Sequence, residues 1–265
     1  MIHPPCRVPE ALREPLKKEL DALIEQGIIA KVEEPTDWVN SLVCVTKSNG
    51  TLRLCLDPKV LNRAIKRPHY CTPALDDVLP RLNGAKYFSI VDARRGYWNI
   101  KLDHASSMYT TFNSSHGRYR FLRLPFGLIC AWDVFQKKVD ETFSDQPDVT
   151  GITDDIVIYG NDLADHDANL KAVMERAGET GLHFSSDKCK VRCKEVPFFG
   201  HIVSASGFRP DPQNVEAINN MDPSTSLADL QTFLGMTQFL SRYVPNLASH
   251  LAALWDLTKG SSEFL

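Results

Sequence analysis

The stretch GITDDIVIYG, residues 151–160, sets two adjacent aspartates inside a run of strand-forming residues. Valine, isoleucine and threonine favour strands, whereas aspartate is depleted there. Aspartate tolerates turns, so the simplest interpretation is a polar turn between two strands. Two carboxylates about 4 Å apart also repel by about 1 kcal/mol in water and about 4 kcal/mol at an effective dielectric constant of 20. Mg²⁺ prefers carboxylate oxygens and would remove this repulsion, so a metal site is the second interpretation.

A third carboxylate favours the metal site. Asp92 lies where the apolar run of YFSIVDARRGYWNIKLD, residues 87–103, stops. If the two segments are neighbours in one antiparallel sheet, Asp92 converges with Asp154 and Asp155. Such a cluster can hold two Mg²⁺ ions about 3.5–4 Å apart, the arrangement that serves phosphoryl transfer. Other acidic pairs, such as Asp76-Asp77, lie in polar or helical context and are expected to be solvated surface.

Composition limits the classes of protein to which the chain can belong. The 265 residues are 43% hydrophobic and 24% charged with a net charge of −3, which predicts one large globular domain or two subdomains. No apolar run is long enough to span a membrane, and the N-terminus does not resemble a signal peptide. The seven cysteines are scattered and odd in number, which fits a reducing compartment. The spacing of His183, Cys189, Cys193 and His201 matches no common zinc pattern.

The periodicity of apolar residues predicts the main elements. Helices are expected over 10–26, 162–180 and 224–244, the last capped by Thr225 or Ser226, and the segment 118–143 is expected to be a strand, a turn and a helix. Hairpins are expected over 41–57 around Asn49-Gly50, over 151–160, and over 196–211 with Ser206-Gly207 near the turn. Strands and helices do not alternate regularly, which predicts an α+β fold.

The order of these motifs resembles the reverse transcriptase of gypsy-type long-terminal-repeat retrotransposons. The matching pieces are CVTKSNGTLRLCLDPKVLN, YFSIVDARRGYWNIKLD, GRYRFLRLPFGLICAWDVFQ, ITDDIVIYG and FFGHIVSASGFRPDPQNVEAI. The resemblance covers about residues 3–263. It implies a right-hand polymerase fold with fingers (1–66 and 100–130), palm (67–99 and 131–205), and a thumb with the start of a connection (206–265). The chain is expected to stop before a ribonuclease H domain.

The resemblance also assigns roles to residues. Asp92, Asp154 and Asp155 match the catalytic, metal-binding carboxylates, and Lys47 and Arg53 match the pair that contacts the incoming triphosphate. Tyr97 matches the aromatic that excludes a ribose 2′-hydroxyl. Phe126 and Gly127 match the turn that lines the nucleotide pocket, and Phe198, Phe199 and Gly200 match the hairpin that grips the primer. A solvated hairpin flank and ordinary apolar packing are the alternative interpretations for the cationic and the aromatic residues.

The implied activity is RNA-directed DNA polymerisation in a polyprotein. It would require two Mg²⁺ ions, with Mn²⁺ as an alternative, together with deoxynucleotides and a primed RNA or DNA template. Further partners would be protease, ribonuclease H and integrase domains or a second copy of the chain, in an intracellular particle or the nucleus and without a membrane. Because the net charge is slightly negative, nucleic acid would be held by local clusters of cationic side chains, such as Arg94-Arg95, Arg118–Arg123 and Lys188–Lys194.

Two positions depart from the family pattern. Ile152-Thr153 replaces the usual tyrosine-containing pair before the aspartates, and Trp132 stands where a smaller or polar residue is usual. A bulky indole there is expected to intrude on the template or nucleotide pocket. A catalytically weakened or inactive nucleic-acid-binding relic of such an element is therefore the alternative function. A polymerase that makes RNA is a third hypothesis, and Tyr97 speaks against it.

Overall fold

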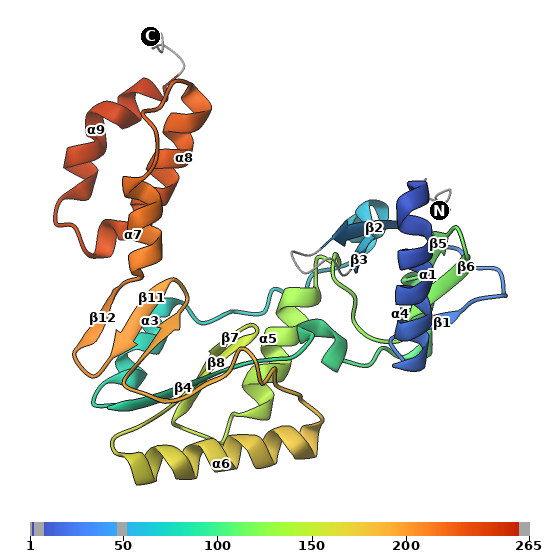
Figure 1. Cartoon of the computed structure of the whole chain (residues 1–265), viewed down its shortest axis with the longest axis horizontal. Helices are drawn as coiled ribbons and strands as arrows, with labels where there is room; N and C mark the ends of the chain where they lie inside the picture. The colour runs from blue at the N-terminus through green and yellow to red at the C-terminus, as the bar shows by residue number, and fades with distance from the viewer. Residues whose placement is uncertain (1, 3–7, 47–51, 260–265) are drawn as a thin grey trace.

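The computed structural model describes residues 2, 8–46 and 52–259. The chain forms an elongated molecule in which an N-terminal unit, a central sheet and a group of C-terminal helices follow one another, with the termini at opposite ends (Figure 1). Every pairing between the named strands of the described part is antiparallel. Helices are interspersed among these strands without parallel crossovers, so the predicted α+β class is confirmed.

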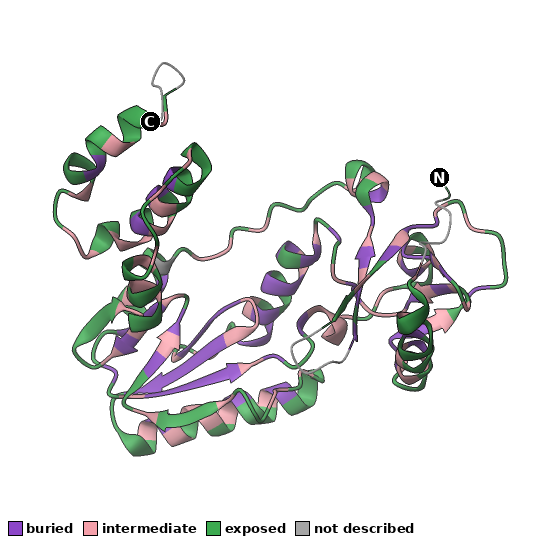
Figure 2. Ribbon diagram, turned by 45° about the horizontal axis from the view of Figure 1, so that its top comes forward, coloured by how far each residue is buried: buried purple, intermediate pink, exposed green. Residues whose placement is uncertain are grey.

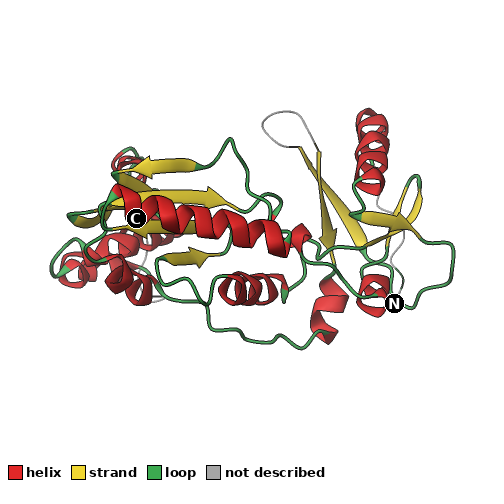
Figure 3. Cartoon of the chain, turned by 90° about the horizontal axis from the view of Figure 1, so that it is seen from below, coloured by secondary structure: helices red, strands yellow, loops and turns green. Residues whose placement is uncertain are grey.

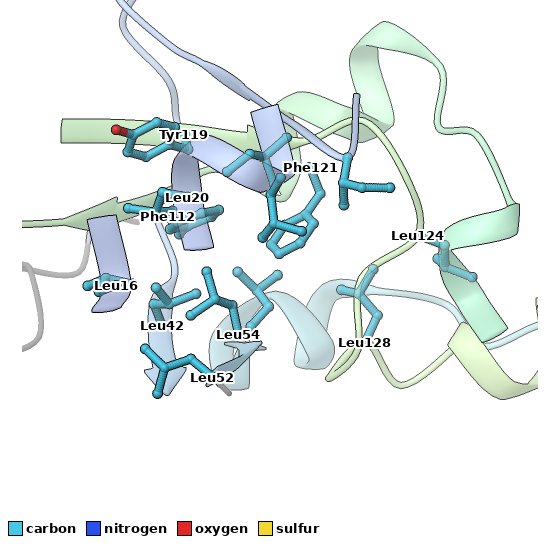
Figure 4. Close-up of a cluster of buried hydrophobic side chains, with 14 of the residues drawn as sticks. Leu16, Leu20, Leu42, Leu52, Leu54, Phe112, Tyr119, Phe121, Leu124 and Leu128 are labelled. Atoms are coloured by element: carbon cyan, nitrogen blue, oxygen red, sulfur yellow. The ribbon is translucent and has the colours of Figure 1, made fainter. Parts of the chain in front are cut away.

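The N-terminal unit is a long helix packed on small sheets. Its elements are α1 (Glu10–Glu25), β1 (Ile29–Lys31), β2 (Ser41–Thr46), β3 (Leu52–Asp57), α2 (Lys59–Ala64), α4 (His104–Tyr109), β5 (Phe112–Ser114) and β6 (Gly117–Phe121). The predicted helix over 10–26 is confirmed, and its spaced leucines Leu16 and Leu20 are fully buried. Figure 4 shows them beside leucines of β2 and β3 and the ring of Phe112. This apolar core fixes β3 against α1.

The hairpin predicted over 41–57 is confirmed for its described residues, because β2 and β3 pair along their whole length from Ser41↔Asp57 to Thr46↔Leu52. Its expected turn at Asn49-Gly50, and with it Lys47, lies outside the described residues.

The central sheet has the strand order β7-β8-β4-β9. Its strands and helices are β4 (Tyr87–Asp92), α5 (Ala131–Thr142), β7 (Val149–Ile152), β8 (Asp155–Gly160), α6 (Leu163–Thr180) and β9 (Lys190–Cys193). The middle of β8 is buried on both faces, because Ile156 and Ile158 pack with residues of α5 and α6 while Val157 and Tyr159 pack on the opposite side. Figure 2 shows β4, β7 and β8 as mostly buried, and Figure 3 shows α6 lying over the sheet. The two-sided cover explains the continuous apolar run in the sequence.

The prediction of a single hairpin over 196–211 is wrong in one respect. The segment forms three antiparallel strands, β10 (Glu195–Phe198), β11 (His201–Ser204) and β12 (Gly207–Pro210). The additional turn falls at Phe199 and Gly200, whose φ angles of 48° and 80° are both left-handed. Two such residues build the tight turn that suits the twist of paired strands. The turn predicted near Ser206-Gly207 does join β11 to β12: Ala205 and Ser206 form it, and Gly207 is the first residue of β12.

The C-terminal helices form a small separate group. They are α7 (Pro212–Asn219), α8 (Leu227–Gln238), η3 (Phe239–Arg242) and α9 (Leu247–Leu257), so the helix predicted over 224–244 is an α-helix that continues as a 3₁₀ turn. Ser226 is its N-cap, since its Oγ accepts a hydrogen bond from the Asp229 amide at 3.1 Å. Arg242 ties this group to the centre through an ion pair with Asp76 on α3 (Leu75–Val78), which η1 (Leu79–Leu82) follows. None of the described helices combines the length and apolarity that crossing a membrane requires.

Candidate active site

Three aspartates meet at one end of the central sheet. Asp92 is the last residue of β4 and stands directly opposite Asp155, the first residue of β8. Asp154 lies in the two-residue turn between β7 and β8, and its carbonyl accepts a hydrogen bond from the Ala93 amide at 2.8 Å. The expectation that the two aspartate segments are neighbours in one antiparallel sheet is therefore confirmed.

The turn that carries Asp154 is held by a buried glutamine. Thr153 has a left-handed φ of 55°, and its amide donates to Gln136 Oε1 at 2.8 Å. Gln136 is fully buried on α5, and its Nε2 donates to the Gly151 carbonyl at 3.0 Å. Sequence reasoning missed this residue. The available signal was a polar amide at a position that helical spacing assigns to the buried side of the helix expected after residue 127.

The carboxylates of this cluster repel one another and are only partly solvated. Burial, followed by the charges of Asp92 and Asp155, raises the pKa of Asp154 to about 6. Burial and the charge of Asp92 also raise the pKa of Asp155. Within the described part of the chain, the buried Oδ1 atom of Asp154 has no hydrogen-bond partner. A buried carboxylate oxygen without a partner is unfavourable unless a cation or donor satisfies it.

Lys188 supplies a positive charge to this cluster. Its Nζ lies 2.9 Å from Asp92 Oδ2, and this hydrogen bond raises the pKa of the lysine. The sequence grouped Lys188 with other cationic residues as a possible phosphate contact, whereas the structure places it against Asp92. Among residues 2, 8–46 and 52–259, no three histidine, cysteine or acidic side chains are arranged as a ready-made metal site. The donor set nevertheless fits Mg²⁺ in its chemistry, because it offers three carboxylates and one unsatisfied buried oxygen.

Gly96 allows the backbone to approach the carboxylates closely. A Cβ atom at this position would lie 2.6 Å from Asp154 Oδ1, which is too close for any side chain. Residue 96 begins the short 3₁₀ turn η2 (Gly96–Asn99), which brings Tyr97 and Trp98 beside the aspartates.

Arg53 and a group of aromatic rings lie beside the carboxylate cluster. The Arg53 guanidinium lies 4.2 Å above the Phe126 ring, and that ring is 4.9 Å from the ring of Tyr97. Burial and then the charge of Asp154 raise the pKa of Tyr97. Gly127 has a φ of 106°, and a Cβ there would lie 2.0 Å from the Leu56 carbonyl oxygen. Only glycine therefore allows the turn after Phe126 to pack against β3.

Arg53, Phe126, Asp92, Asp154 and Lys188 line one cavity of about 440 Å³. The cavity thus brings together four of the eight sequence-predicted catalytic and nucleotide-binding residues, namely Asp92, Asp154, Arg53 and Phe126. Tyr97, Gly127 and Asp155 do not line it: Tyr97 lies against the rings of Phe126 and Phe135, Gly127 packs against β3, and Asp155 lies in the strand opposite Asp92. Lys47 lies outside the described residues.

The three residues predicted to bind primer have different environments. Phe198 is 1% exposed and belongs to the core beside the sheet, so its ring packs in the interior as the alternative interpretation expected. Phe199 is 52% exposed at the turn between β10 and β11. The carbonyl of Gly200 accepts hydrogen bonds from the Asp211 amide and from Asn214 Nδ2, each at 3.2 Å.

The two departures from the family pattern do not disturb the cavity. Ile152 is 2% exposed and packs in the core, so it replaces the usual residue with a well-buried one. Trp132 Nε1 donates to Thr72 Oγ1 at 2.8 Å, and Trp132 is not among the residues that line the cavity. The expected intrusion of the indole on the nucleotide side of the site is therefore not seen.

Comparison with known proteins agrees with this geometry. The family "Reverse transcriptase (RNA-dependent DNA polymerase)" matches residues 45–203, more than half of the chain. The fold is the α+β fold of known reverse transcriptase structures. The chain belongs to the reverse transcriptase family, and it is similar to polyproteins of retrotransposons, among them opus and gypsy.

Two relatives and one solved structure illustrate the match. The chain is 32% identical over 260 residues to the Retrovirus-related Pol polyprotein from transposon opus of Drosophila melanogaster, covering 95% of this chain and 26% of that protein. It is 27% identical over 256 residues to the corresponding polyprotein from transposon gypsy of Drosophila melanogaster, covering 93% and 24%. The structure of the foamy viral protease-reverse transcriptase in complex with double-stranded DNA superposes with a TM-score of 0.90 at 22% identity, covering 99% of this chain and 46% of that one. The chain therefore spans about a quarter of the length of these two polyproteins.

Proposed function

We propose that this chain is an RNA-directed DNA polymerase that extends a primer along an RNA or DNA template with deoxynucleotides. The observation that carries the proposal is the meeting of Asp92 and Asp154 with Arg53 around one cavity, since these are the charges that nucleotidyl transfer needs. Family membership supports the same activity.

Asp92, Asp154 and Asp155 would hold two Mg²⁺ ions. When bound, the metal supplies Lewis-acid stabilisation of the charge that develops on the phosphate and on the attacking and leaving oxygens. The raised pKa values of Asp154 and Asp155 support this assignment, because a cation would favour their ionised forms.

The other residues of the cavity orient the substrates. The planar guanidinium of Arg53 suits a triphosphate, and its position over the Phe126 ring restricts its freedom before the substrate arrives. Tyr97 supports that ring and would close the space beneath the sugar against a ribose 2′-hydroxyl. Phe199 and Gly200 would contact the primer, with Phe198 as the buried anchor of their turn.

In the reaction, a bond forms between the primer 3′-oxygen and the α-phosphorus of the nucleotide. The bond from the α-phosphorus to its bridging oxygen breaks, so pyrophosphate leaves and the hydroxyl proton passes to solvent. Lys188 would balance the charge of Asp92 when the site is empty of metal.

Other polyprotein domains or a second copy of the chain would act as partners. The boundaries of fingers, palm and thumb would lie at the residues predicted from the sequence.

Primer extension tests the proposal. Purified protein is incubated with a primed RNA template, deoxynucleotides and Mg²⁺, in parallel with Asp154→Asn and with a chelator. We expect extension only by the parent protein with free metal. Nucleic-acid binding without any extension above the Asp154→Asn background would contradict the proposal and favour the inactive relic.

A further inference from the structure

A second cavity of about 980 Å³ adjoins the candidate active site. The two cavities share Arg94, Arg95 and Trp98 in their walls. The second cavity is bounded by the turn that follows β4, by the end of α1 at Gln26 and by the C-terminal end of α6 at Gly178–Gly181. Its volume lies in the range of small-molecule sites, so it is sized for a compact ligand rather than for a long strand.

The cavity is strongly cationic. Arg94, Arg95, Lys101 and Arg123 all line it, and within the described part of the chain none of the four forms an ion pair with a carboxylate. Two of them are positioned by uncharged groups: Arg95 contacts the Gln26 amide oxygen, and Arg123 donates to the Asn99 carbonyl at 3.4 Å. Like charges gathered around one hollow repel one another unless an anion occupies it.

The negative groups near this cavity do not neutralise it. Glu179 is the one acidic residue among those that line it, and its carboxylate pairs with Arg176 at 3.3 Å. The C-terminal end of α6 contributes only about half an elementary charge. The cavity therefore keeps an excess of positive charge.

We propose that this second cavity is a binding site for inorganic di- or triphosphate. Arginine guanidinium groups bind phosphate oxygens through paired hydrogen bonds, and three arginines and a lysine offer more donors than a single phosphate can use. A chain of two or three phosphates carries the multiple charges that such a site would match. The cavity could be the route by which pyrophosphate leaves the active site, or by which the triphosphate of a nucleotide approaches it, and this role rests on the proposed function. The binding of polyphosphate in the cavity does not depend on the proposed function.

The test is calorimetric titration of the full chain with inorganic pyrophosphate and with tripolyphosphate, without divalent cations. The variant K101Q/R123Q removes two charges from the far side of the cavity and leaves the shared wall intact. The matched control K17Q/K18Q removes two exposed lysines of α1 that do not line the cavity. We expect both ligands to bind the parent and the control equally, and the K101Q/R123Q variant to bind about tenfold or more weakly.

Primer extension in the presence of added pyrophosphate distinguishes the two sources of the ligand, which are the pyrophosphate product and the triphosphate of the incoming nucleotide. Weaker inhibition by pyrophosphate in K101Q/R123Q supports product release through the cavity, and a raised KM for deoxynucleotides supports access of the triphosphate. If the parent binds pyrophosphate through these residues but extends no primer, the site stands and the proposed function fails. Equal binding by the parent and K101Q/R123Q would overturn the site. The site would also be overturned if the parent protein bound an RNA oligonucleotide through Lys101 and Arg123 but did not bind pyrophosphate.

Discussion

Strand β4 carries two polar clusters with opposite properties. At its end, the carboxylate cluster of Asp92, Asp154 and Asp155 contains mutual repulsion and an unpartnered buried oxygen. Three residues earlier, Ser89 begins what we call the histidine network, which comprises Ser89, His166, Asp167 and Arg192. Ser89 Oγ and His166 Nε2 are 2.8 Å apart, and both residues are fully buried.

The histidine network is fully satisfied. His166 Nδ1 contacts Asp167 Oδ1 at 3.2 Å, and Arg192 binds the Asp167 carboxylate through two hydrogen bonds of 2.9 and 2.8 Å. The Arg192 amide also donates to Ser89 Oγ at 3.1 Å. This serine, histidine and aspartate are in contact, but full burial of Ser89 and His166 leaves no access for a substrate. The comparison teaches that one strand joins α6 and β9 through paired polar groups, whereas at its end Asp92 pairs with Lys188 and Asp154 keeps a buried oxygen without a partner among the described residues.

The largest expected effect concerns the carboxylate cluster. Asp92→Asn should reduce primer extension by about 10³-fold, because it removes a charged ligand from the metal site while leaving the strand intact. Single-turnover extension and thermal unfolding are measured together, with the exposed Asp187→Asn as control. An Asp92→Asn protein that is folded and extends primer as fast as the parent would break the comparison.

The histidine network should show the reverse pattern. His166→Ala leaves a cavity and removes one of the two hydrogen-bond partners of the buried Ser89 hydroxyl, so the free energy of unfolding should fall by about 3 kcal/mol. Extension per folded molecule should stay within about twofold of the parent. Denaturant titration measures the loss, and the exposed His250→Ala is the control. Unchanged stability in His166→Ala would show that the network contributes nothing to the fold.

A smaller effect is expected from pH. Because the folded pKa of Asp154 is raised to about 6, this carboxyl contributes stability that is complete below its ordinary pKa and is lost as pH rises through about 6. Asp154→Asn should therefore be more stable than the parent near pH 8 by about 1–2 kcal/mol, after discounting for partial exposure, and the gap should shrink toward pH 5. Thermal unfolding between pH 5 and pH 8 measures the stability difference between Asp154→Asn and the parent. A difference that grows as pH falls would contradict the prediction.

The smallest effect is expected at Trp132. Its indole donates to Thr72 and does not line the cavity, so Trp132→Phe should change primer extension by less than about twofold. Steady-state kinetics with varied deoxynucleotide concentration provide the measurement. A large fall in KM would mean that the indole obstructs the nucleotide after all.

Local patterns predicted the main elements but not the contacts between distant segments. The apolar runs that flank Asp154-Asp155 and the Asn49-Gly50 dipeptide were sufficient to predict two hairpins, because such signals lie within a few residues. The turn at Phe199-Gly200 was missed, since a bulky aromatic with positive φ is uncommon. The short helices α7 and α9 were also not predicted.

Prediction of the candidate active site has the same limit, because contacts between distant segments are not visible in local patterns. The three aspartates and Arg53 were predicted from motifs, but the support of the turn by Gln136 and the pairing of Lys188 with Asp92 join residues far apart in the chain. No pattern in one sequence reports such pairs. The boundaries of fingers, palm and thumb stay a prediction.

Metal binding gives the most direct test of the claim that the three carboxylates share a cation. Electron paramagnetic resonance measures free Mn²⁺ during titration of the parent protein, Asp92→Asn, Asp154→Asn and His166→Ala. The account predicts that Mn²⁺ binding is lost in the two aspartate variants and kept in folded His166→Ala. Equal Mn²⁺ binding by the parent and both aspartate variants would contradict it.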